Sequence, residues 1–284
     1  MIVLIGTIPL ETGLYVGPAR IEKDALFVGA DRVPIERGSA AMAASCVQAC
    51  TFYGLPMPVC IFGGDTGTGA GTGLMFEEVI RNLHNYAPEV VTLHYLFPKI
   101  AFGRPLIEKI ASLAHKPQLV ADAGGMYLIK SIKKSSFFDV FTPDRGELLF
   151  LADELAGHPI YVRSETAPRT DDTDALAARA YKQGDAPATL LVKGAIDSIY
   201  LRGTKVGECA SPNLPAMEAI GGTGDTITGM LSAFRFAGDS DAELKASRVN
   251  RLIGEAAKCT PATQIIEFIE QVPFALERYE TDDA

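Results

Sequence analysis

The sequence lacks the clustered positive charge on which nucleic-acid-binding proteins depend. The formal net charge of the 284 residues is −9, and no long run of Lys and Arg offsets it. Because phosphate backbones attract clustered basic side chains, this balance argues against a nucleic-acid partner. It does not exclude small polyanionic ligands, since a local nest of backbone N–H groups binds phosphate even within an acidic protein.

Apolar runs of membrane-spanning length are also lacking. No run approaches the roughly 18 residues that a span requires, so we expect no membrane partner. The opening Met1–Gly6 has no basic stretch and meets Pro9 early, which favours a strand over a signal peptide.

Cysteine is scarce, and its five copies lie in apolar surroundings. Cys46 and Cys50 fall in a predicted helix and could share a face, but no histidine lies near them in sequence to complete a metal site. We expect reduced, packed thiols and therefore a cytoplasmic protein.

Apolar, β-branched segments alternate with helical patterns along most of the chain. With 48% apolar and 21% charged residues, the composition is that of a globular protein. Several strand candidates, such as Val59–Phe62 and Thr189–Val192, are apolar at consecutive positions, which is typical of strands covered on both faces. We predict an α/β fold, a single domain over residues 1–284 with a mostly parallel central sheet and helices on both faces.

The predicted elements follow from this alternation. Strands are expected at 2–6, 25–29, 58–63, 90–95, 118–122, 137–142, 189–193 and 197–201, and the strand-like pattern continues from 197 to 209. Helices are expected at 39–53, 73–86, 104–114, 126–134, 144–156, 173–183, 224–237, 241–258 and 261–270. The polar stretch 156–175 is predicted to be an exposed connection within the domain.

The segment 220–234 combines a glycine-rich turn with the start of an apolar helical pattern. Such a turn gathers unpaired backbone N–H groups and the positive end of a helix dipole, which favours phosphate oxygens. Asp225 stands in the same turn and would repel an anion placed against it. The conflict is resolved if Asp225 faces the group that receives a phosphoryl. We therefore interpret the chain as a phosphoryl-transfer enzyme.

A second glycine-dense segment spans residues 63–73, between a predicted strand and a predicted helix. It is not a P-loop, because no Gly-Lys-Ser/Thr follows, and its spacing does not match G-x-G-x-x-G. In open α/β sheets, ligands bind beyond the carboxyl ends of strands, where this loop is expected. Asp65, Gly67 and Gly69 are therefore candidate substrate-binding residues, and a flexible turn without a ligand is the alternative.

The segment 142–147 follows a predicted strand and opens a helix. Thr142 suits a capping position and Pro143 the first helical position, so a structural helix start explains part of the pattern. Glu147 is equally able to reach Mg²⁺ through water, because this ion keeps much of its hydration shell. Both interpretations remain open from the residues alone.

Two further polar residues end predicted strands. Asp122 is a candidate for substrate binding, with a simple helix cap as the alternative. Lys193 is a candidate for contact with nucleotide phosphates, although an ordinary surface lysine explains it as well. With Glu147 and the two glycine-rich turns, these residues converge on one edge of the predicted sheet.

Other common catalytic sets are missing from the sequence. The histidines at positions 84, 94, 115 and 158 show neither metal spacing nor a nucleophile partner, so we expect them to be surface or core residues. Nothing resembles a Ser-His-Asp set or a zinc site.

Three motifs taken together resemble the ribokinase-like superfamily. They are Thr142-Pro-Asp-x-x-Glu147, Leu191-Val-Lys-Gly194 and Gly222-Thr-Gly-Asp225-Thr-x-x-Gly229. Within it, the chain is most similar to the carbohydrate-kinase branch that contains the ADP- or ATP-dependent NAD(P)H-hydrate dehydratases. The order and spacing agree from about residue 25 to 258.

The resemblance implies a ribokinase-like three-layer sandwich with nucleotide and acceptor sites along one sheet edge. By it, Asp225 corresponds to the catalytic aspartate, Glu147 to a glutamate that helps to hold Mg²⁺, and Lys193, with Gly194, to a nucleotide-binding lysine. The phosphate-binding anion hole corresponds to Gly222, Thr223 and Gly224.

The chain also departs from the usual dehydratase pattern. Dehydratases usually carry His-Pro where this chain has Asp144-Arg145, and a Gly-Pro-Gly-Leu-Gly loop where it has Asp65–Gly69. Their Asp-Ala-Asp-x-x-Asn is replaced by Asp122-Ala-Gly-Gly-Met-Tyr127, without the second acid or the amide.

We therefore expect an enzyme that moves the terminal phosphoryl of ATP or ADP, with Mg²⁺, onto a small-molecule hydroxyl. If the likeness to dehydratases holds, the acceptor is hydrated NAD(P)H, and loss of the phosphate restores NAD(P)H. The alternatives are a small-molecule or sugar kinase and a non-catalytic nucleotide sensor, which would not require the proton acceptor Asp225. The sequence does not fix the oligomeric state, and a homo-oligomer is compatible with it.

Overall fold

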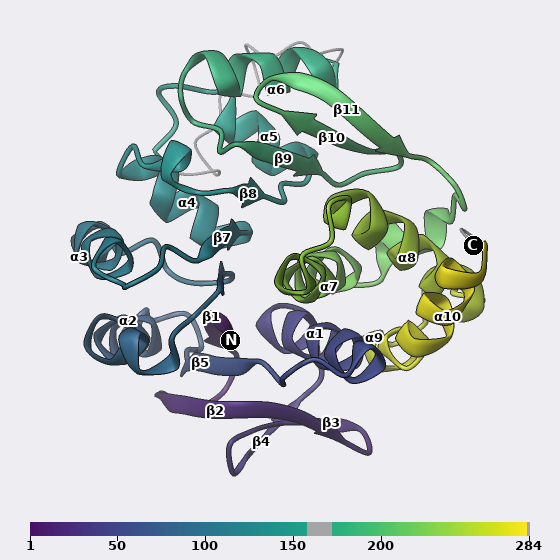
Figure 1. Ribbon diagram of the computed structural model, residues 1–284, viewed down its shortest axis with the longest axis horizontal. Helices are drawn as coiled ribbons and strands as arrows, with labels where there is room; N and C mark the ends of the chain where they lie inside the picture. The colour runs from purple at the N-terminus through teal and green to yellow at the C-terminus, as the bar shows by residue number, and fades with distance from the viewer. Residues whose placement is uncertain (158–171, 283–284) are drawn as a thin grey trace.

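The apolar segments of the chain pair into one continuous sheet, which Figure 1 shows for the computed structural model. The structure describes residues 1–157 and 172–282. Within these residues the sheet has eleven strands in the order β11-β10-β9-β8-β7-β6-β1-β5-β2-β3-β4. The strands are β1 (Ile2–Ile8), β2 (Gly13–Glu22), β3 (Ala25–Val28), β4 (Asp31–Pro34), β5 (Val59–Gly64), β6 (Val90–Leu93), β7 (Gln118–Ala121), β8 (Val140–Phe141), β9 (Thr189–Val192), β10 (Asp197–Leu201) and β11 (Thr204–Cys209).

The centre of the sheet is parallel and both of its edges are antiparallel. Strands β5, β1, β6, β7, β8 and β9 run in one direction. Strands β10 and β11 at one edge, and β2, β3 and β4 at the other, run antiparallel to their neighbours. The predicted α/β class with a mostly parallel central sheet is confirmed.

Helices connect these strands. They are α1 (Ser39–Tyr53), α2 (Ala70–Asn82), α3 (Ile100–Ala111), α4 (Ala123–Ser131), α5 (Arg145–Leu151), α6 (Thr173–Lys182), α7 (Thr223–Ala237), α8 (Ala242–Ala256), α9 (Ile265–Ile269) and α10 (Val272–Asp282). Short 3₁₀ helices occur at η1 (Leu83–Tyr86), η2 (Ser135–Phe137) and η4 (Pro215–Ala219).

The helices form two layers with the sheet between them. In Figure 1, α2, α3 and α4 lie on one side of the sheet, and α1, α7 and α8 lie on the other. Side chains alternate between the two cores along β1: Leu4 belongs to the core under α1 and α7, and Val3 to the core under α2 and α3. Burial on both faces explains why the central strands are apolar at every position.

Helices α1 and α7 pack so closely that a glycine is required between them. A Cβ at Gly229 would lie 2.0 Å from the carbonyl oxygen of Met42, a distance that no side chain tolerates. The alanines at 40, 41, 43 and 44, on either side of Met42, keep this part of α1 thin as well. This close packing brings the first residues of α1 and α7 together at the carboxyl edge of the parallel strands.

Three elements were not predicted from the sequence: β2, β4 and α10. Strand β2 is mostly exposed or half-buried along its ten residues, and β4 has only four residues. Edge strands of this kind lack the run of buried apolar residues by which a central strand is recognised.

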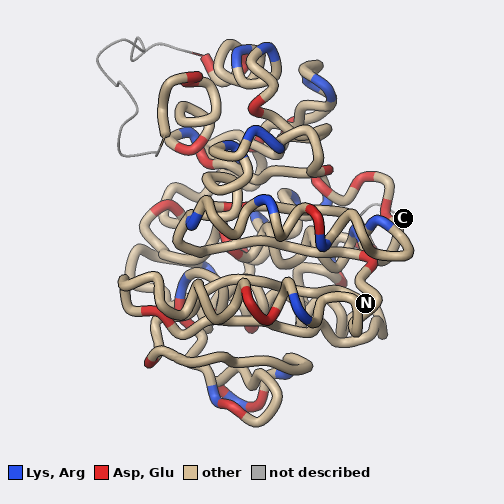
Figure 2. The backbone as a smooth tube through the Cα atoms, turned by 90° about the vertical axis from the view of Figure 1, so that its left-hand side faces the viewer, with Lys and Arg blue, Asp and Glu red and all other residues tan. Residues whose placement is uncertain are grey.

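The outside of the molecule carries charges of both signs. Figure 2 shows Lys and Arg interspersed with Asp and Glu along the helices that face the viewer. No helix within residues 1–157 and 172–282 is long and apolar enough to cross a membrane. The cysteines are free: Cys46, Cys50, Cys60 and Cys209 are buried and Cys259 is partly buried.

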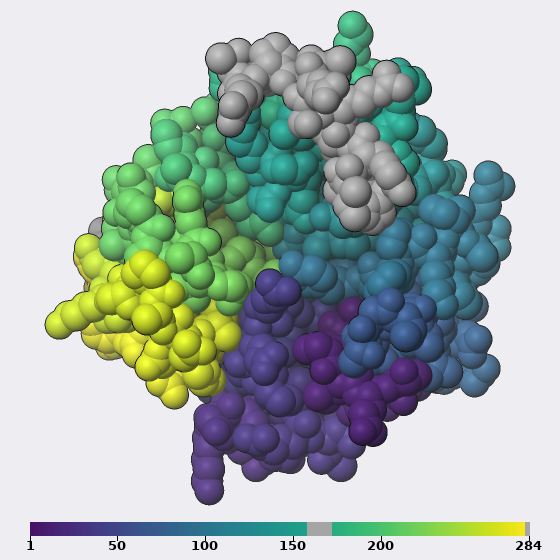
Figure 3. All heavy atoms as spheres, turned by 180° about the vertical axis from the view of Figure 1, so that it is seen from behind, coloured from purple at the N-terminus to yellow at the C-terminus, as the bar shows by residue number. Residues whose placement is uncertain are grey.

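The two ends of the chain contribute to the same side of the fold. Figure 3 shows the yellow C-terminal helices against the blue-purple N-terminal segment, and α10 packs on both α1 and α8. One sheet shared by both halves is compatible with a single domain over 1–284, which stays a prediction. Most of the predicted connection at 156–175, with His158, lies outside the described residues.

Candidate active site

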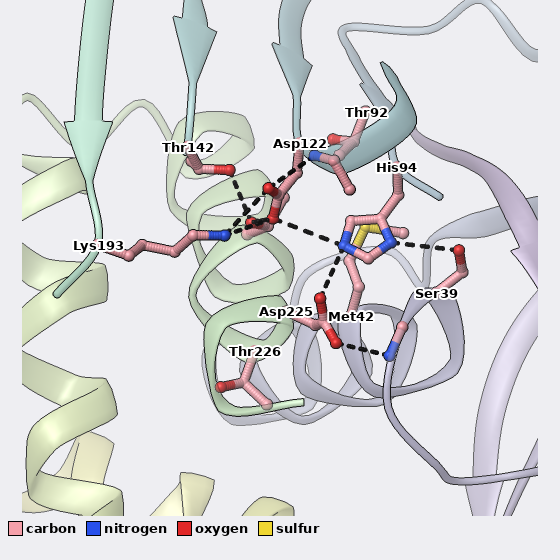
Figure 4. Close-up of polar contacts among 12 residues, drawn as sticks. Ser39, Met42, Thr92, His94, Asp122, Thr142, Lys193, Asp225 and Thr226 are labelled. Atoms are coloured by element: carbon pink, nitrogen blue, oxygen red, sulfur yellow. Dashed lines mark hydrogen bonds and ion pairs between the residues drawn. The ribbon is translucent and has the colours of Figure 1, made fainter. Parts of the chain in front are cut away.

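A polar residue directly follows each of four neighbouring parallel strands. His94 follows β6, Asp122 follows β7, Thr142 follows β8 and Lys193 follows β9. Because these strands are adjacent and parallel, the four residues lie in a row at the carboxyl edge of the sheet. Figure 4 shows Lys193 pointing to Asp122, and the imidazole of His94 between Asp122 and Asp225.

Asp122 and Lys193 form a buried ion pair. The Lys193 Nζ lies 3.0 and 2.8 Å from the two carboxylate oxygens of Asp122, which is 1% exposed. The hydroxyl of Thr228 and the backbone N–H of Ala123 also donate to Asp122, at 2.6 and 2.8 Å. Burial alone would raise the pKa of Asp122, but Lys193 and His94 hold it well below its usual range. Asp122 is thus an internal counter-ion as well as the helix cap that the sequence left as an alternative.

Asp225 stands in the first turn of α7, whose N-cap is Gly222 with a φ of 110°. Its Oδ2 accepts a hydrogen bond of 2.6 Å from the backbone N–H of Gly38, just before α1. Its Oδ1 lies 3.2 Å from Nε2 of His94. The side chain is 12% exposed and lines a cleft, so it is neither turned into the interior nor remote from a ligand site.

His94 is a site residue that was not predicted from the sequence. It is fully buried, as the core interpretation allowed, but it also lies between two carboxylates. Its Nε2 is 3.6 Å from Asp122 and 3.2 Å from Asp225, and its Nδ1 is 3.2 Å from the hydroxyl of Ser39. Burial lowers the pKa of His94, but the hydrogen bonds and charges of Asp122 and Asp225 outweigh it and raise the pKa to about 9.

The ligand atoms of His94, Asp122 and Asp225 all lie within 4.8 Å of one another, close enough to share a metal ion. Metal binding requires a neutral imidazole. The two carboxylates instead favour a charged ring, and the ammonium of Lys193 already contacts Asp122. Two cationic side chains therefore supply the positive charge that a metal ion would bring.

The cleft beside Asp225 has a volume of about 520 Å³, within the range of small-molecule sites. Its lining includes the predicted residues Asp122, Glu147, Lys193, Gly194, Gly222, Thr223, Gly224 and Asp225. Tyr95 and Arg37, which the sequence analysis did not single out, also line it. Arg37 packs along Gly221, and within the described ranges it has no ion pair or hydrogen bond.

The turn before α7 presents open backbone donors. Within residues 1–157 and 172–282, the N–H groups of Gly222 and Gly224 have no hydrogen-bond partner. The N–H of Thr223 makes only a long bond of 3.5 Å to Ile220, and its hydroxyl is held by the carbonyls of Met217 and Ile220. Open donors at a helix N-terminus are suited to bind an anion. The phosphate-binding role of Gly222, Thr223 and Gly224 stays a prediction.

Glu147 belongs to a capping box at the start of α5. Its Oε2 accepts from the N–H of Asp144 at 2.9 Å, and its Oε1 accepts from the hydroxyl of Tyr127 at 2.7 Å. Burial and the negative charge of Asp122 raise the pKa of Glu147 to about 7. A structural helix start is present, but the predicted cap and first helical position are wrong: the N-cap of α5 is Asp144 and its first residue is Arg145, while the Thr142 hydroxyl lies 2.9 Å from that of Thr228. The magnesium role of Glu147 stays a prediction.

The loop 63–73 is organised around its own aspartate. Asp65 accepts backbone hydrogen bonds from Gly67, Thr68, Gly69 and Thr72, at 2.9 to 3.1 Å. Neither Asp65 nor the loop glycines belong to the lining of the cleft beside Asp225. Their predicted role in substrate binding stays a prediction, and the carboxylate serves to fix the loop.

The chain is similar to several known proteins. A family model described as NAD(P)H-hydrate dehydratase, of the carbohydrate-kinase type, matches residues 98–269. An uncharacterized protein of Methanocaldococcus jannaschii, MJ1337, is 38% identical over 218 residues, which cover 75% of this chain and 89% of that protein. The bifunctional NAD(P)H-hydrate repair enzyme Nnr of Pyrobaculum aerophilum is 30% identical over 176 residues, 61% of this chain and 32% of the enzyme. This chain therefore matches about a third of that larger protein.

Solved structures show with which proteins the chain shares its fold. Ribokinase from Giardia lamblia superposes with a TM-score of 0.57 at 13% identity, with 98% of each chain covered. At this identity the likeness concerns the fold alone. The family model spans more than half of the sequence, and the chain belongs to the NAD(P)H-hydrate dehydratase family of carbohydrate-kinase-type proteins, on a ribokinase-like fold.

Proposed function

We propose that this protein transfers the terminal phosphoryl group of ATP or ADP to the hydroxyl of a small molecule, with hydrated NAD(P)H as that acceptor. The observation that carries the proposal is the position of Asp225. It offers a carboxylate on the wall of the cleft, beside the open N–H groups of Gly222 and Gly224. Family membership and the name of the Pyrobaculum relative support the same chemistry.

In the proposed reaction, the terminal P–O bond of the nucleotide breaks while a new P–O bond forms to the acceptor oxygen. The N–H groups of Gly222 and Gly224, with the ammonium of Lys193 nearby, stabilise the charge on the transferring group. Asp225 orients the hydroxyl and accepts its proton. With hydrated NAD(P)H, the C–O bond to the phosphate then breaks as the neighbouring ring carbon loses a proton, which restores NAD(P)H and releases phosphate.

Lys193 is well suited to this task because it is already placed and charged. Its ammonium is anchored by Asp122, and the negative charges around it raise its pKa despite burial. Gly224 has no Cβ, and the atom nearest to where one would stand is the Lys193 Nζ, at 3.5 Å. The lysine therefore borders the anion-binding turn directly.

The residues present fit a water-mediated Mg²⁺ better than a directly bound one. Each oxygen of Glu147 already accepts one hydrogen bond from the protein, which leaves capacity for water. Mg²⁺ keeps several waters and binds nucleotide phosphates through few protein carboxylates. When bound, the ion would neutralise charge on the phosphates, and Glu147 is the residue that would hold its water shell.

The wall beside Asp225 favours an acceptor with a ring over a simple sugar. Tyr95 lines the cleft with 46% of its surface exposed, and its ring lies against the Gly38 that holds Asp225. A half-exposed aromatic wall offers a flat apolar contact for the nicotinamide-derived ring. A plain small-molecule or sugar kinase is the second candidate, because the phosphoryl-transfer residues would be the same.

The test is turnover with defined acceptors. The protein is incubated with ATP or ADP, Mg²⁺ and hydrated NADH, and both NADH absorbance and released phosphate are followed. We expect one NADH and one phosphate for each nucleotide consumed. A parallel reaction with sugars and no hydrated NADH serves as the control.

Each outcome separates the candidates. Accumulation of a phosphorylated acceptor without recovery of NADH would support the kinase. Nucleotide binding without consumption, across hydrated NADH, hydrated NADPH and the sugar panel, would contradict phosphoryl transfer and favour a nucleotide sensor.

A further inference from the structure

We propose that His94 is a positioning residue that holds the Asp225 carboxylate in place and joins it to Asp122. The proposal rests on the phosphoryl transfer assigned above and adds a residue to it. His94 does not line the cleft, so its action passes through Asp225. Figure 4 shows the imidazole between the two carboxylates.

The contacts fix Asp225 from two sides. The backbone N–H of Gly38 holds Oδ2 at 2.6 Å, and Nε2 of His94 faces Oδ1 at 3.2 Å. These two groups come from the residue before α1 and the residue after β6, two elements that are distant in sequence. A carboxylate has about four lone-pair directions, so two remain for the hydroxyl of an acceptor.

The imidazole is itself held rigidly. Ser39 faces Nδ1 at 3.2 Å, and the ring of Tyr95 packs edge-on at a centroid distance of 4.9 Å. His94 is fully buried, so no solvent competes for its nitrogens. A ring fixed in this way keeps the Asp225 carboxylate in one position. This matters because a small displacement of a reacting group lowers the rate by a large factor.

Charge balance gives the arrangement a second purpose. Asp225, His94, Asp122 and Lys193 form a continuous series of two acids and two bases. With both bases charged, the set is neutral. Without His94, the uncompensated carboxylate would stand beside the incoming phosphates and repel them.

The groups that face the ring are Asp122 at the start of α4, Asp225 on α7 and the neighbouring Tyr95, with Lys193 behind Asp122. Burial and the nearby carboxylates raise the pKa of Tyr95 to about 12, so it stays neutral over the working range. The charge on His94 is therefore the one expected to change as the pH rises through about 9.

Two substitutions separate the contact from the charge. His94→Gln can place an amide N–H where Nε2 stands, so it keeps a donor and loses the charge. His94→Leu removes both. We expect kcat to fall about 10-fold in His94→Gln and about 100-fold in His94→Leu. ATP should bind more weakly to both variants, because both lose the charge that compensates the carboxylates. His84→Gln, at an exposed histidine paired with Lys109, is the matched control.

The pH profile gives a readout that a purely structural role would not move. Wild-type kcat should decline above about pH 9, where the ring loses its proton, and His94→Gln should lack this decline. Thermal unfolding of each variant checks that the fold persists. If both variants keep wild-type kcat and pH profile while the wild type turns over, the inference is wrong and the proposed function stands.

An NMR titration tests the inference even if no acceptor is turned over. In the wild type the ring nitrogens of His94 should show a charged imidazole at pH 7.5, and Asp225→Asn should lower its pKa. A neutral ring, or a titration unchanged in Asp225→Asn, would overturn the proposal. So would a shift of these nitrogens on adding Mn²⁺ or Zn²⁺ alone, which would indicate a metal site instead.

Discussion

Two glycine-rich turns of this protein each hold an aspartate, and they use it in opposite ways. In the loop after β5, Asp65 accepts four backbone hydrogen bonds from its own loop. In the turn before α7, Asp225 accepts from Gly38 and faces His94, both far away in sequence, and it borders the cleft. Glycine density alone therefore does not distinguish an aspartate that organises its own loop from one that joins distant elements at the cleft.

The largest effect should come from Asp225→Asn. The amide keeps an oxygen for the Gly38 N–H, so the fold should persist, but it is a far weaker proton acceptor. We expect turnover to fall about 100-fold or more, as loss of a positioned base usually causes, with ATP binding retained. Steady-state kinetics and a binding titration measure both. Turnover equal to that of the wild type would remove Asp225 from the proposed reaction.

The second-largest effect should come from Gly71→Ala, in the first turn of α2. A Cβ at this position would lie 2.0 Å from the carbonyl oxygen of Gly64, and the backbone would have to shift to relieve the clash. We expect the free energy of unfolding to fall by about 1–3 kcal/mol, the range for overpacking. Urea unfolding measures it.

Gly73→Ala, in the same helix, is the control. There the nearest atom is the mobile Lys99 Nζ at 3.3 Å, and alanine should be tolerated. Equal destabilisation by the two substitutions would show that the loop is not shaped by this close approach.

Asp65→Asn should lower the free energy of unfolding and leave turnover largely unchanged. The amide has one acceptor oxygen for four N–H donors, so at least one donor loses its partner, at about 1–2 kcal/mol. Burial would raise the pKa of Asp65, but these backbone donors outweigh it and lower the pKa below its ordinary 3.8. The stabilisation is therefore complete above about pH 4 and is lost as the pH falls through the lower folded-state pKa.

Urea unfolding at pH 7 and at pH 3 measures this dependence. The difference between the wild type and Asp65→Asn should narrow at the lower pH. A difference that widens at pH 3 would contradict the lowered pKa of Asp65. A loss of turnover as large as that of Asp225→Asn would support the predicted role of Asp65 in substrate binding.

The smallest effect should be that of Gly224→Ala. Its Cβ would lie 3.5 Å from the Lys193 Nζ, an ordinary contact, so unfolding should be unaffected. The methyl group would nevertheless border the phosphate position, and we expect ATP to bind about threefold to tenfold more weakly, up to about 1.4 kcal/mol. Calorimetric titration with ATP and Mg²⁺ measures this, and unchanged affinity would exclude Gly224 from the anion hole.

Much of the fold could be predicted because the signals are local. The helix at 39–53 and the strand starting at 189 were predicted with the bounds that α1 and the start of β9 have. A strand buried on both faces must be apolar at every position, and that pattern is visible without any partner. Strands β2 and β4 were not predicted, because strands toward the edge of the sheet need not be apolar at every position.

The site was predicted less completely, and His94 shows why. The sequence placed it inside a strand at 90–95, whereas β6 ends at Leu93 and His94 is the first residue beyond it. Asp122 and Lys193 occupy the same position after β7 and β9, and were predicted as candidates because they end the predicted strands 118–122 and 189–193. The last residue of a strand is set by its neighbours in the sheet, which the sequence does not display.

The sequence by itself determined the elements and the chemistry of the turn at 220–225, because glycine conformations, helix dipoles and apolar periodicity act within a few residues. Only the tertiary structure decided which side chains meet. The order of strands β6, β7, β8 and β9 lines up residues almost a hundred positions apart. The backbone N–H of Gly38, just before α1, donates a hydrogen bond to Asp225, which is 187 residues away. Through-space charge and hydrogen bonding depend on distance alone, and folding sets that distance.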